Sequence, residues 1–232
     1  MTSASSEEWS GPVADGGPAH ASSNRRERFG GKVWDVVTED VEFENSTAAR
    51  DVLIHPGAVA VIALDDAERV LLIRQYRHAV GTYLFEPPAG LLDAVGEPPH
   101  LTAVRELAEE AGYEAADWAV LVDTYLTPGG SSEAIRVYLA RGLRPLADGR
   151  VHTGEAEEAH LPRAWVPLDE ARRLVLSGAI GSPTAVIGVL AASASRDGGW
   201  ASLRPASAPW PARDRLLTTD RVRLPHEDRS TS

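Results

Sequence analysis

Three glutamates lie close together in residues 103–113, whose sequence is AVRELAEEAGY. Alanine, leucine and glutamate favour helix, and apolar residues recur at intervals of three and four, which predicts a helix with one apolar face. Glu106, Glu109 and Glu110 would share the opposite, solvent-facing side, where like charges repel by about 0.2–0.5 kcal/mol per pair. Such a cluster is either a solvated acidic surface or a site for divalent cations, which prefer oxygen ligands and are shared with substrate phosphates.

The elements predicted around this helix alternate between strands and helices. Alternating apolar residues predict one or two strands in residues 32–44, and a hairpin is expected from residues 55–66 and 69–79 around the turn DDAE. Further strands are predicted at 118–126, 134–143 and 163–168, and further helices at 169–178 and 182–195, the last with Ser182 as its N-cap and Pro183 in its first turn. Interleaved strands and helices predict an α/β fold, a mixed sheet covered on both faces.

Composition excludes several classes of protein. The 232 residues contain no cysteine, which excludes disulfides, thiolate catalysis and cysteine-bound zinc or iron–sulfur sites. A formal net charge of −11 disfavours sequence-independent binding to nucleic acid. No apolar run approaches the roughly 20 residues of a membrane helix and no secretory signal is visible, so we expect no membrane partner and a cytoplasmic location.

Composition also divides the chain into three parts. Residues 1–28 are rich in serine, glycine, alanine and proline and are expected to lack fixed structure. Residues 29–195 are expected to form one domain. Residues 196–232 form a Pro- and Ser-rich tail that keeps Trp200 and Trp210, so parts of this tail are expected to dock on the domain and the rest to be disordered.

The segment EPPAGLLDAVGEPPHLTAVRELAEEAGY, residues 86–113, resembles the signature of the Nudix hydrolases. Glu97 and the run from Arg105 to Gly112 fit that signature without adjustment. Six residues separate Gly90 from Glu97 instead of five, and Tyr113 occupies a position that is aliphatic in the signature. Neither departure touches a carboxylate, so the resemblance strengthens the metal interpretation over the solvated surface.

This resemblance implies a Nudix fold, a mixed sheet between helices with antiparallel strands at the N-terminus, and a Mg²⁺ cofactor that Mn²⁺ can replace. Glu106 and Glu110, one turn apart, would bind the same ion, and Glu109 would bind a second ion or act in catalysis. The backbone carbonyl of Ala89 would join the coordination. Arg105 would orient the glutamates by ion pairing.

The substrate expected from the resemblance is a nucleoside diphosphate derivative. Pro128, fifteen residues after Tyr113, is similar to the marker of the ADP-ribose pyrophosphatase branch, whose members produce AMP and ribose 5-phosphate. Two alternatives stay open: hydrolysis of another nucleotide (a nucleotide sugar, NADH, a dinucleoside polyphosphate or an oxidised nucleotide), and a Nudix module that senses a nucleotide without cleaving it. The sensor is disfavoured because every carboxylate of the signature is present.

The branch also implies residues outside the signature. A glutamate on a late loop would act as base or position the water, and Glu157 and Glu158 are the candidates, ahead of Glu155. The alternative for each is a solvated loop carboxylate.

Four further residues are candidates for substrate binding. Arg50 and Arg77 fall where the branch places arginines that contact phosphates or the terminal ribose, a task for which the planar guanidinium is suited. Glu86 can hold a substrate hydroxyl or a metal-bound water. Trp34 can stack on adenine, although a core or interface position is the simpler interpretation.

Residues 32–44 also suggest a homodimer. They are apolar on both faces, and a two-stranded ribbon of this kind needs two coverings. The branch implies that one covering is the partner subunit, which would help to complete the adenine site. The alternative is a monomer whose tryptophan-containing C-terminal tail covers the same surface.

Overall fold

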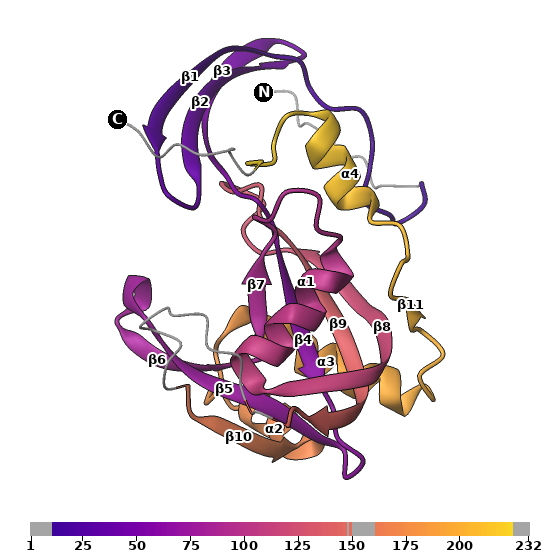
Figure 1. Ribbon diagram of the computed structural model, residues 1–232. Helices are drawn as coiled ribbons and strands as arrows, with labels where there is room; N and C mark the ends of the chain where they lie inside the picture. Colours follow the sequence, from indigo (N-terminus) through magenta and orange to yellow (C-terminus); the bar gives the residue numbers. More distant parts are fainter. Residues whose placement is uncertain (1–10, 148, 150–160, 225–232) are drawn as a thin grey trace.

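The structure is a computed structural model that describes residues 11–147, 149 and 161–224. A three-stranded antiparallel ribbon stands apart from the main domain and consists of β1 (Ser22–Gly30), β2 (Asp35–Phe43) and β3 (Ser46–Ile54) (Figure 1). β2 is central, and its register with β3 is continuous from Asp35–Ile54 to Phe43–Ser46.

The main domain contains two sheets. The larger has the order β11-β8-β9-β4-β7, with bounds Arg204–Pro205, Tyr113–Tyr125, Ala134–Pro145, Ala58–Ala63 and Ala89–Leu91. It is mixed, because β4 and β9 are parallel while the other pairs are antiparallel. The smaller sheet has the order β10-β5-β6, with bounds Arg163–Pro167, Arg69–Arg77 and Thr82–Glu86.

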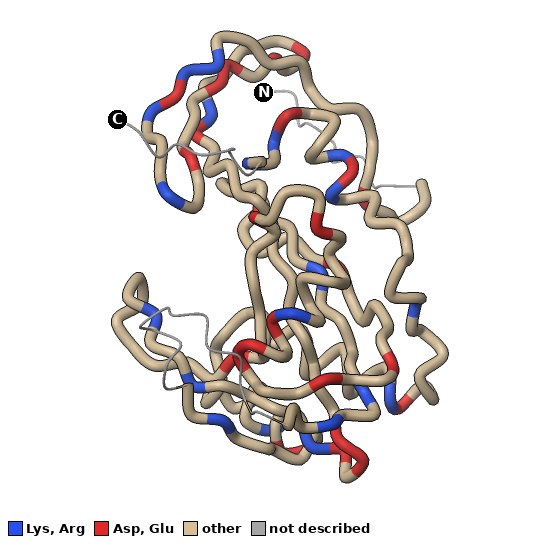
Figure 2. The backbone as a smooth tube through the Cα atoms, viewed as in Figure 1, with Lys and Arg blue, Asp and Glu red and all other residues tan. Residues whose placement is uncertain are grey.

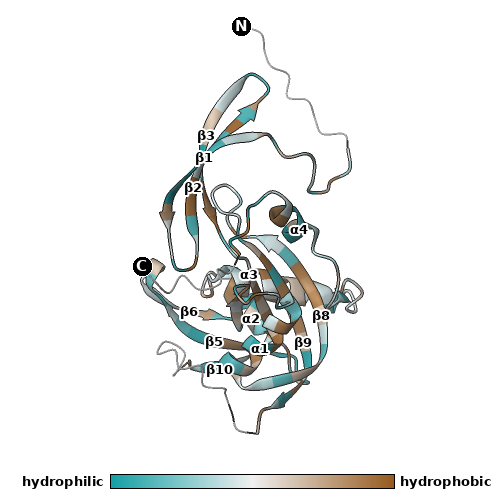
Figure 3. Ribbon diagram, turned by 45° about the horizontal axis from the view of Figure 1, so that its top comes forward, coloured by the Kyte–Doolittle hydropathy of each residue, from teal (hydrophilic) through white to brown (hydrophobic). Residues whose placement is uncertain are grey.

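Helices cover both faces of the larger sheet. They are α1 (Pro99–Glu106), which continues as the π-helix η2 (Leu107–Ala111), α2 (Leu168–Leu176), α3 (Pro183–Asp197) and α4 (Pro211–Thr218); a short 3₁₀ turn, η1, spans His78–Val80. On β4, Ala60 and Ile62 face the cluster formed with α2 and α3, while Val59 and Val61 face the cluster formed with α1. All six β4 residues are buried, and Figure 3 shows hydrophobic colours concentrated in the central strands. The predicted α/β fold with a sheet covered on both faces is confirmed.

One predicted strand pairing is wrong, and one strand of the ribbon was missed. The expected hairpin of residues 55–66 and 69–79 is wrong, because β4 and β5 belong to different sheets and share only the isolated bridge Leu64–Val70. The Asp65 carboxylate accepts the backbone N–H groups of Ala67 and Arg69, and this tight turn directs the chain from one sheet to the other. β3 was not predicted, because most of its side chains are exposed and its sequence lacks apolar alternation.

The expected tails differ from the structure in part. Residues 22–28, which were expected to lack fixed structure, lie in β1, although all nine β1 residues are exposed. Backbone pairing with β2 forms this strand, and composition carries no signal for such pairing. At the other end α3 continues to Asp197, past the expected boundary at 195. Beyond it, β11 and α4 dock on the domain and Trp210 is buried.

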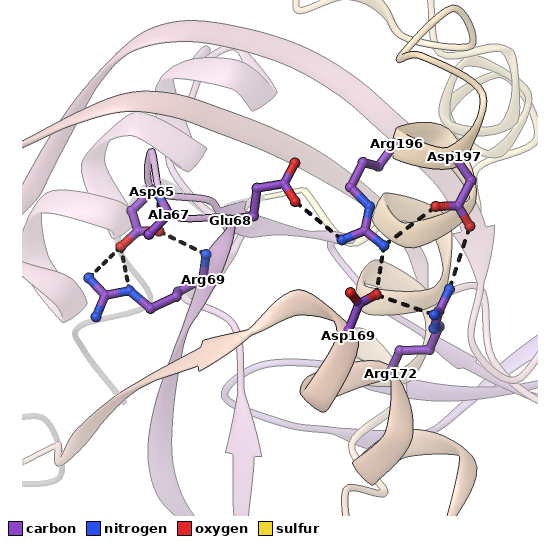
Figure 4. A network of polar contacts seen from close by, with 8 residues as sticks. All are labelled: Asp65, Ala67, Glu68, Arg69, Asp169, Arg172, Arg196 and Asp197. Atoms are coloured by element: carbon purple, nitrogen blue, oxygen red, sulfur yellow. Dashed lines mark hydrogen bonds and ion pairs between the residues drawn. The ribbon is translucent and has the colours of Figure 1, made fainter.

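An ion-pair network joins the turn before β5 to the helices α2 and α3 (Figure 4). Arg196 of α3 pairs with Asp169 of α2 at 2.6 Å and with Glu68 at 3.4 Å. Arg172 pairs with Asp169 and Asp197. The acidic members of the network, Glu68, Asp169 and Asp197, are exposed, so these ion pairs link the helices at the surface, outside their apolar packing. Within the described residues, no helix is long and apolar enough to cross a membrane.

Candidate active site

The acidic side of the helix is more buried than the sequence predicts. Pro99 occupies its first turn, and Gly112, with φ of 72°, ends it in the left-handed conformation that glycine tolerates. Glu106 and Glu110 are 8% and 4% exposed, so the expectation that the glutamates face solvent is wrong for these two; Glu109 is half-buried. The last turn is a π-helix, a distortion that occurs frequently at functional sites.

Arg105 joins the acidic side chains. Its Nη1 lies 2.7 Å from Glu106 Oε1 and 2.9 Å from Glu109 Oε2, and its Nη2 lies 3.2 Å from Glu97 Oε2. Burial disfavours the charged guanidinium, but hydrogen bonds and charge from these glutamates outweigh it and raise the pKa of Arg105. The hydrogen bond from Arg105 likewise holds the pKa of Glu97 below its usual value, against the opposing effect of burial. Glu97 therefore stays ionised although it is partly removed from water.

Strand β7 closes over the same carboxylates. The backbone N–H of Ala89 donates to Glu110 Oε2 at 2.8 Å. At Gly90 a Cβ would overlap the Glu106 side chain, so any larger residue would displace the Glu106 carboxylate where the strand meets the helix. β7 is held in turn by its pairing with β4. The local geometry thus explains why a glycine precedes the acidic helix.

The chemistry of this oxygen-rich donor set fits a hard divalent cation such as Mg²⁺ or Mn²⁺. Within the ranges that the structure describes, however, no three acidic or histidine side chains converge in a metal-binding arrangement. Glu106 and Glu109 instead contact Arg105, and Glu110 contacts the Ala89 N–H. A bound cation would take the place of these partners at Glu106 and Glu109.

A cleft of about 410 Å³ adjoins this acidic site. Ala89 and Gly90 line it on one side, and Arg77, Glu86 and Ser182 line it as well. The Arg77 guanidinium lies 2.7 Å from the buried Glu86 carboxylate. Thus Arg77 and Glu86, two of the predicted substrate-binding residues, lie together beside the expected metal ligands.

Sequence reasoning missed two residues of this cleft, Glu133 and Ser182. Burial raises the pKa of Glu133, whose carboxylate lies 3.8 Å from His55 Nε2. Glu133 ends the segment TPGGSSE, residues 127–133, of which the sequence analysis used only Pro128. Ser182 was expected only as a helix cap; it occupies the N-cap position, but its hydroxyl makes no capping bond and donates to Glu86 instead.

Other candidates lie elsewhere. Arg50 lines a separate cleft of about 420 Å³, together with Pro128, between the ribbon and the loop after β8. Trp34 is 38% exposed and packs against Phe29, with ring centroids 5.9 Å apart. Within this single chain neither residue lines the cleft beside the acidic helix. Glu157 and Glu158, like Glu155, lie outside the described residues.

Comparison with known proteins identifies the family. The model for the NUDIX domain matches residues 54–183, more than half of the chain. The chain is 49% identical to the ADP-ribose pyrophosphatase of Mycobacterium tuberculosis over 161 residues, covering 69% of this chain and 76% of that protein. It is 39% identical to the ADP-ribose pyrophosphatase of Bacillus subtilis over 151 residues, covering 64% of this chain and 79% of that protein. The chain therefore belongs to the Nudix family.

A solved structure supports the fold. The crystal structure of an ADP compounds hydrolase superposes with a TM-score of 0.67 at 23% identity, covering 80% of this chain and 98% of that one. The Nudix fold predicted from the sequence is confirmed, and so is the resemblance to the ADP-ribose pyrophosphatases. Nudix hydrolases generally depend on a divalent metal, in agreement with the oxygen-rich donor set beside β7.

Proposed function

We propose that this protein hydrolyses the pyrophosphate bond of ADP-ribose and releases AMP and ribose 5-phosphate. The observation that carries the proposal is the position of Arg77 in the same cleft as the Ala89–Gly90 backbone, against which the buried glutamates Glu106 and Glu110 pack. A cation bound by carboxylates beside an arginine suits the two negative charges of a pyrophosphate. The similarity to two ADP-ribose pyrophosphatases supports this substrate.

Mg²⁺, with Mn²⁺ as a substitute, is the proposed cofactor. Glu106, Glu109, Glu110 and the Ala89 carbonyl would hold it, and when bound it would neutralise the pyrophosphate and acidify a bound water. Arg105 would keep the ligand carboxylates oriented, as its contacts with Glu106 and Glu109 suggest. A glutamate would accept the proton of the attacking water, and Glu109, Glu157 and Glu158 stay candidates for that base.

The test is a phosphate-release screen over a panel of nucleotides, with and without Mg²⁺. ADP-ribose should give a higher kcat/KM than GDP-mannose, NADH, diadenosine polyphosphates or an oxidised nucleotide. Another substrate preferred by tenfold or more would replace ADP-ribose and keep the metal chemistry. Nucleotide binding without turnover of any substrate would favour a sensor.

We also propose that the active form is a homodimer in which the ribbon lies at the interface. Three aromatic side chains on the ribbon and its connecting turn, Phe29, Trp34 and Phe43, are 38–55% exposed, which supports a covering by a second copy. Arg50 and Trp34 would then act at the partner's substrate site. The alternative is a monomer whose C-terminal tail covers the ribbon. It has support too, since Arg221 and Arg223 of that tail contact the ribbon.

Light scattering at micromolar concentration separates the two arrangements. A mass near the 24.8 kDa of one chain, with full activity, would overturn the dimer. Deleting residues 1–18 should preserve the dimer, because β1 begins only at Ser22. Deleting through Glu44 should abolish both assembly and ADP-ribose binding. The cytoplasmic location expected from the sequence stays part of the proposal, and cell fractionation tests it.

A further inference from the structure

The buried carboxylate of Glu86 has two different partners. Ser182 Oγ donates to its Oε1 at 3.0 Å, while Arg77 Nε donates to its Oε2 at 2.8 Å. Arg77 Nη2 also lies 2.7 Å from Oε2. Ser182 is 1% and Glu86 is 6% exposed, whereas the Arg77 side chain is 46% exposed. The chain of contacts therefore runs from a buried hydroxyl through a buried carboxylate to a guanidinium that reaches the cleft.

The use of the Ser182 hydroxyl is unusual for its position. Ser182 is the N-cap residue of α3, where a serine side chain ordinarily accepts a backbone N–H and stabilises the helix by about 1 kcal/mol. Here no side-chain capping bond forms, and the hydroxyl is directed to Glu86, with the Thr184 hydroxyl 3.1 Å away. The helix therefore lacks the stabilisation of a side-chain cap, and the Ser182 hydroxyl binds the Glu86 carboxylate instead.

This bond restricts the orientation of Glu86, and Glu86 restricts that of Arg77. A carboxylate held at one oxygen by a rigid helix terminus cannot rotate freely, so its second oxygen offers a fixed acceptor. Glu86 occupies the Nε and Nη2 donors of Arg77, and the guanidinium carries five N–H groups in a planar fork. Among the described residues the Nη1 edge therefore stays available for an anion in the cleft that Arg77, Glu86 and Ser182 line together.

We propose that Ser182 is a positioning residue, which holds Glu86 so that Arg77 presents its remaining N–H groups to the pyrophosphate of the substrate. This inference rests on the proposed function and extends it to a residue outside the Nudix signature. Ser182 does not touch the reacting atoms in this account. Its effect on the substrate passes through Glu86 and Arg77.

The test compares Ser182→Ala with Ser195→Ala. Both serines are buried in the region of α3, but the Ser195 hydroxyl contacts Ser202 at the far end of the helix. Binding of ADP-ribose is measured by calorimetry in the presence of EDTA, so that no turnover interferes. Ser182→Ala should raise Kd about tenfold, the effect of one lost bond to a charged group, and Ser195→Ala should leave it unchanged.

A double-mutant cycle separates positioning from a general loss of structure. In an Arg77→Ala background, Ser182→Ala should have almost no further effect on Kd, because there is no guanidinium left to orient. With Mg²⁺ present, Ser182→Ala should raise KM about tenfold and change kcat by less than about twofold. A wild-type Kd for Ser182→Ala, or an equal loss in both backgrounds, would overturn the proposal.

Whether the wild-type protein cleaves ADP-ribose tests the proposed function separately from the role of Ser182. If wild-type protein does not cleave ADP-ribose, the substrate assignment fails. The same cycle measured with inorganic pyrophosphate as the ligand then still decides whether Ser182 acts through Arg77. Coupling between the two positions would support the inference, and additive effects would contradict it.

Discussion

The central sheet and the N-terminal ribbon are both built from paired strands, yet they are stabilised by different forces. All six residues of β4 are buried between two apolar clusters, whereas all nine residues of β1 are exposed. The ribbon is held to the main domain through polar contacts, among them Arg221 with Glu39 and Arg223 with Asp35. Figure 2 shows basic and acidic residues intermixed along the ribbon.

This difference indicates how the two regions respond to change. Apolar burial is worth about 25 cal/mol per Å² and is insensitive to salt, so the sheet that positions the acidic helix is rigid. The Arg221–Glu39 and Arg223–Asp35 pairs are partly buried, since the Glu39 and Arg223 side chains are 4% and 15% exposed, so salt screens them less than it screens surface pairs. Ion pairs still depend on salt more than apolar packing does, so the placement of the ribbon is more adjustable than that of the sheet. The proposed chemistry lies in the rigid region, and the adjustable region carries Arg50 and Trp34, which are proposed to act at the partner's site.

The largest expected effect is on turnover in the rigid region. Glu106→Gln and Glu110→Gln should each reduce kcat for ADP-ribose about a hundredfold or more, because each removes a proposed anionic metal ligand. Steady-state hydrolysis at saturating Mg²⁺ measures the loss. Glu114→Gln is the matched control, since Glu114 is exposed on the next strand and should behave as wild type. Near-normal turnover of both variants would make the acidic helix a structural element only.

The second effect compares two tryptophans, one in each region. Trp210 is 5% exposed, and the Arg136 guanidinium lies 4.8 Å from its ring centroid. Trp210→Ala should lower the free energy of unfolding by about 3–5 kcal/mol, as expected for a buried aromatic side chain. Trp34→Ala, in the turn between β1 and β2, should cost less than about 1 kcal/mol. Urea denaturation measures both, and equal losses would contradict the distinction between the regions.

A third effect concerns pH at the junction of the two regions. His55 follows β3, its carbonyl accepts the Arg223 N–H, and burial lowers its pKa to about 4. Folding is stabilised by neutral His55 above its unfolded pKa of about 6.5, and this stabilisation is lost as pH falls through that value toward 4. Between about pH 7.5 and pH 5 the loss amounts to about 2 kcal/mol. The raised pKa of Glu133 acts in the opposite direction, because its neutral form is favoured in the fold and stabilises it as pH falls.

The variant His55→Asn tests this pH dependence. Asparagine has no titratable group, and it keeps an acceptor for the Gly57 N–H that now donates to His55 Nδ1 at 3.0 Å. The free energy of unfolding of the variant should fall less than that of wild type between about pH 7.5 and pH 5. Identical slopes for the two proteins would show that His55 does not contribute.

The smallest effect is expected in the ribbon. Arg223 lies 3.2 Å from Asp35 and donates to the carbonyls of Gly31 and Lys32. Arg223→Ala should change the global stability by less than about 1 kcal/mol but increase amide exchange in β1 and β2 while leaving β4 protected. Raising salt from about 0.05 to about 0.5 M should act in the same direction. Arg173→Ala, which removes an exposed pair on α2, is the control and should leave the ribbon unchanged.

The sequence by itself determined the parts whose signals are local. The spacing of Glu97, Arg105, Glu106, Glu109, Glu110 and Gly112 identified the acidic helix and the family, and the structure places Arg105 in contact with three of these glutamates. Apolar patterns predicted β4, β8 and β9 of the larger sheet and the helices α2 and α3, but not the short strands β7 and β11 or the helix α4. These signals can be read from the sequence alone because the apolar periodicity of a helix or strand repeats every few residues.

Only the tertiary structure decided which distant residues meet. Pairing of β1 with β2, separation of β4 and β5 into different sheets, and burial of Glu106 and Glu110 beneath β7 all depend on contacts between segments far apart in the chain. Ser182 contacts Glu86, which lies 96 positions earlier in the chain. The residues next to Ser182 in the sequence therefore indicated only that it caps a helix. A serine at a helix start has the same local sequence whether its hydroxyl caps the helix or binds a carboxylate, and the fold alone selects its partner.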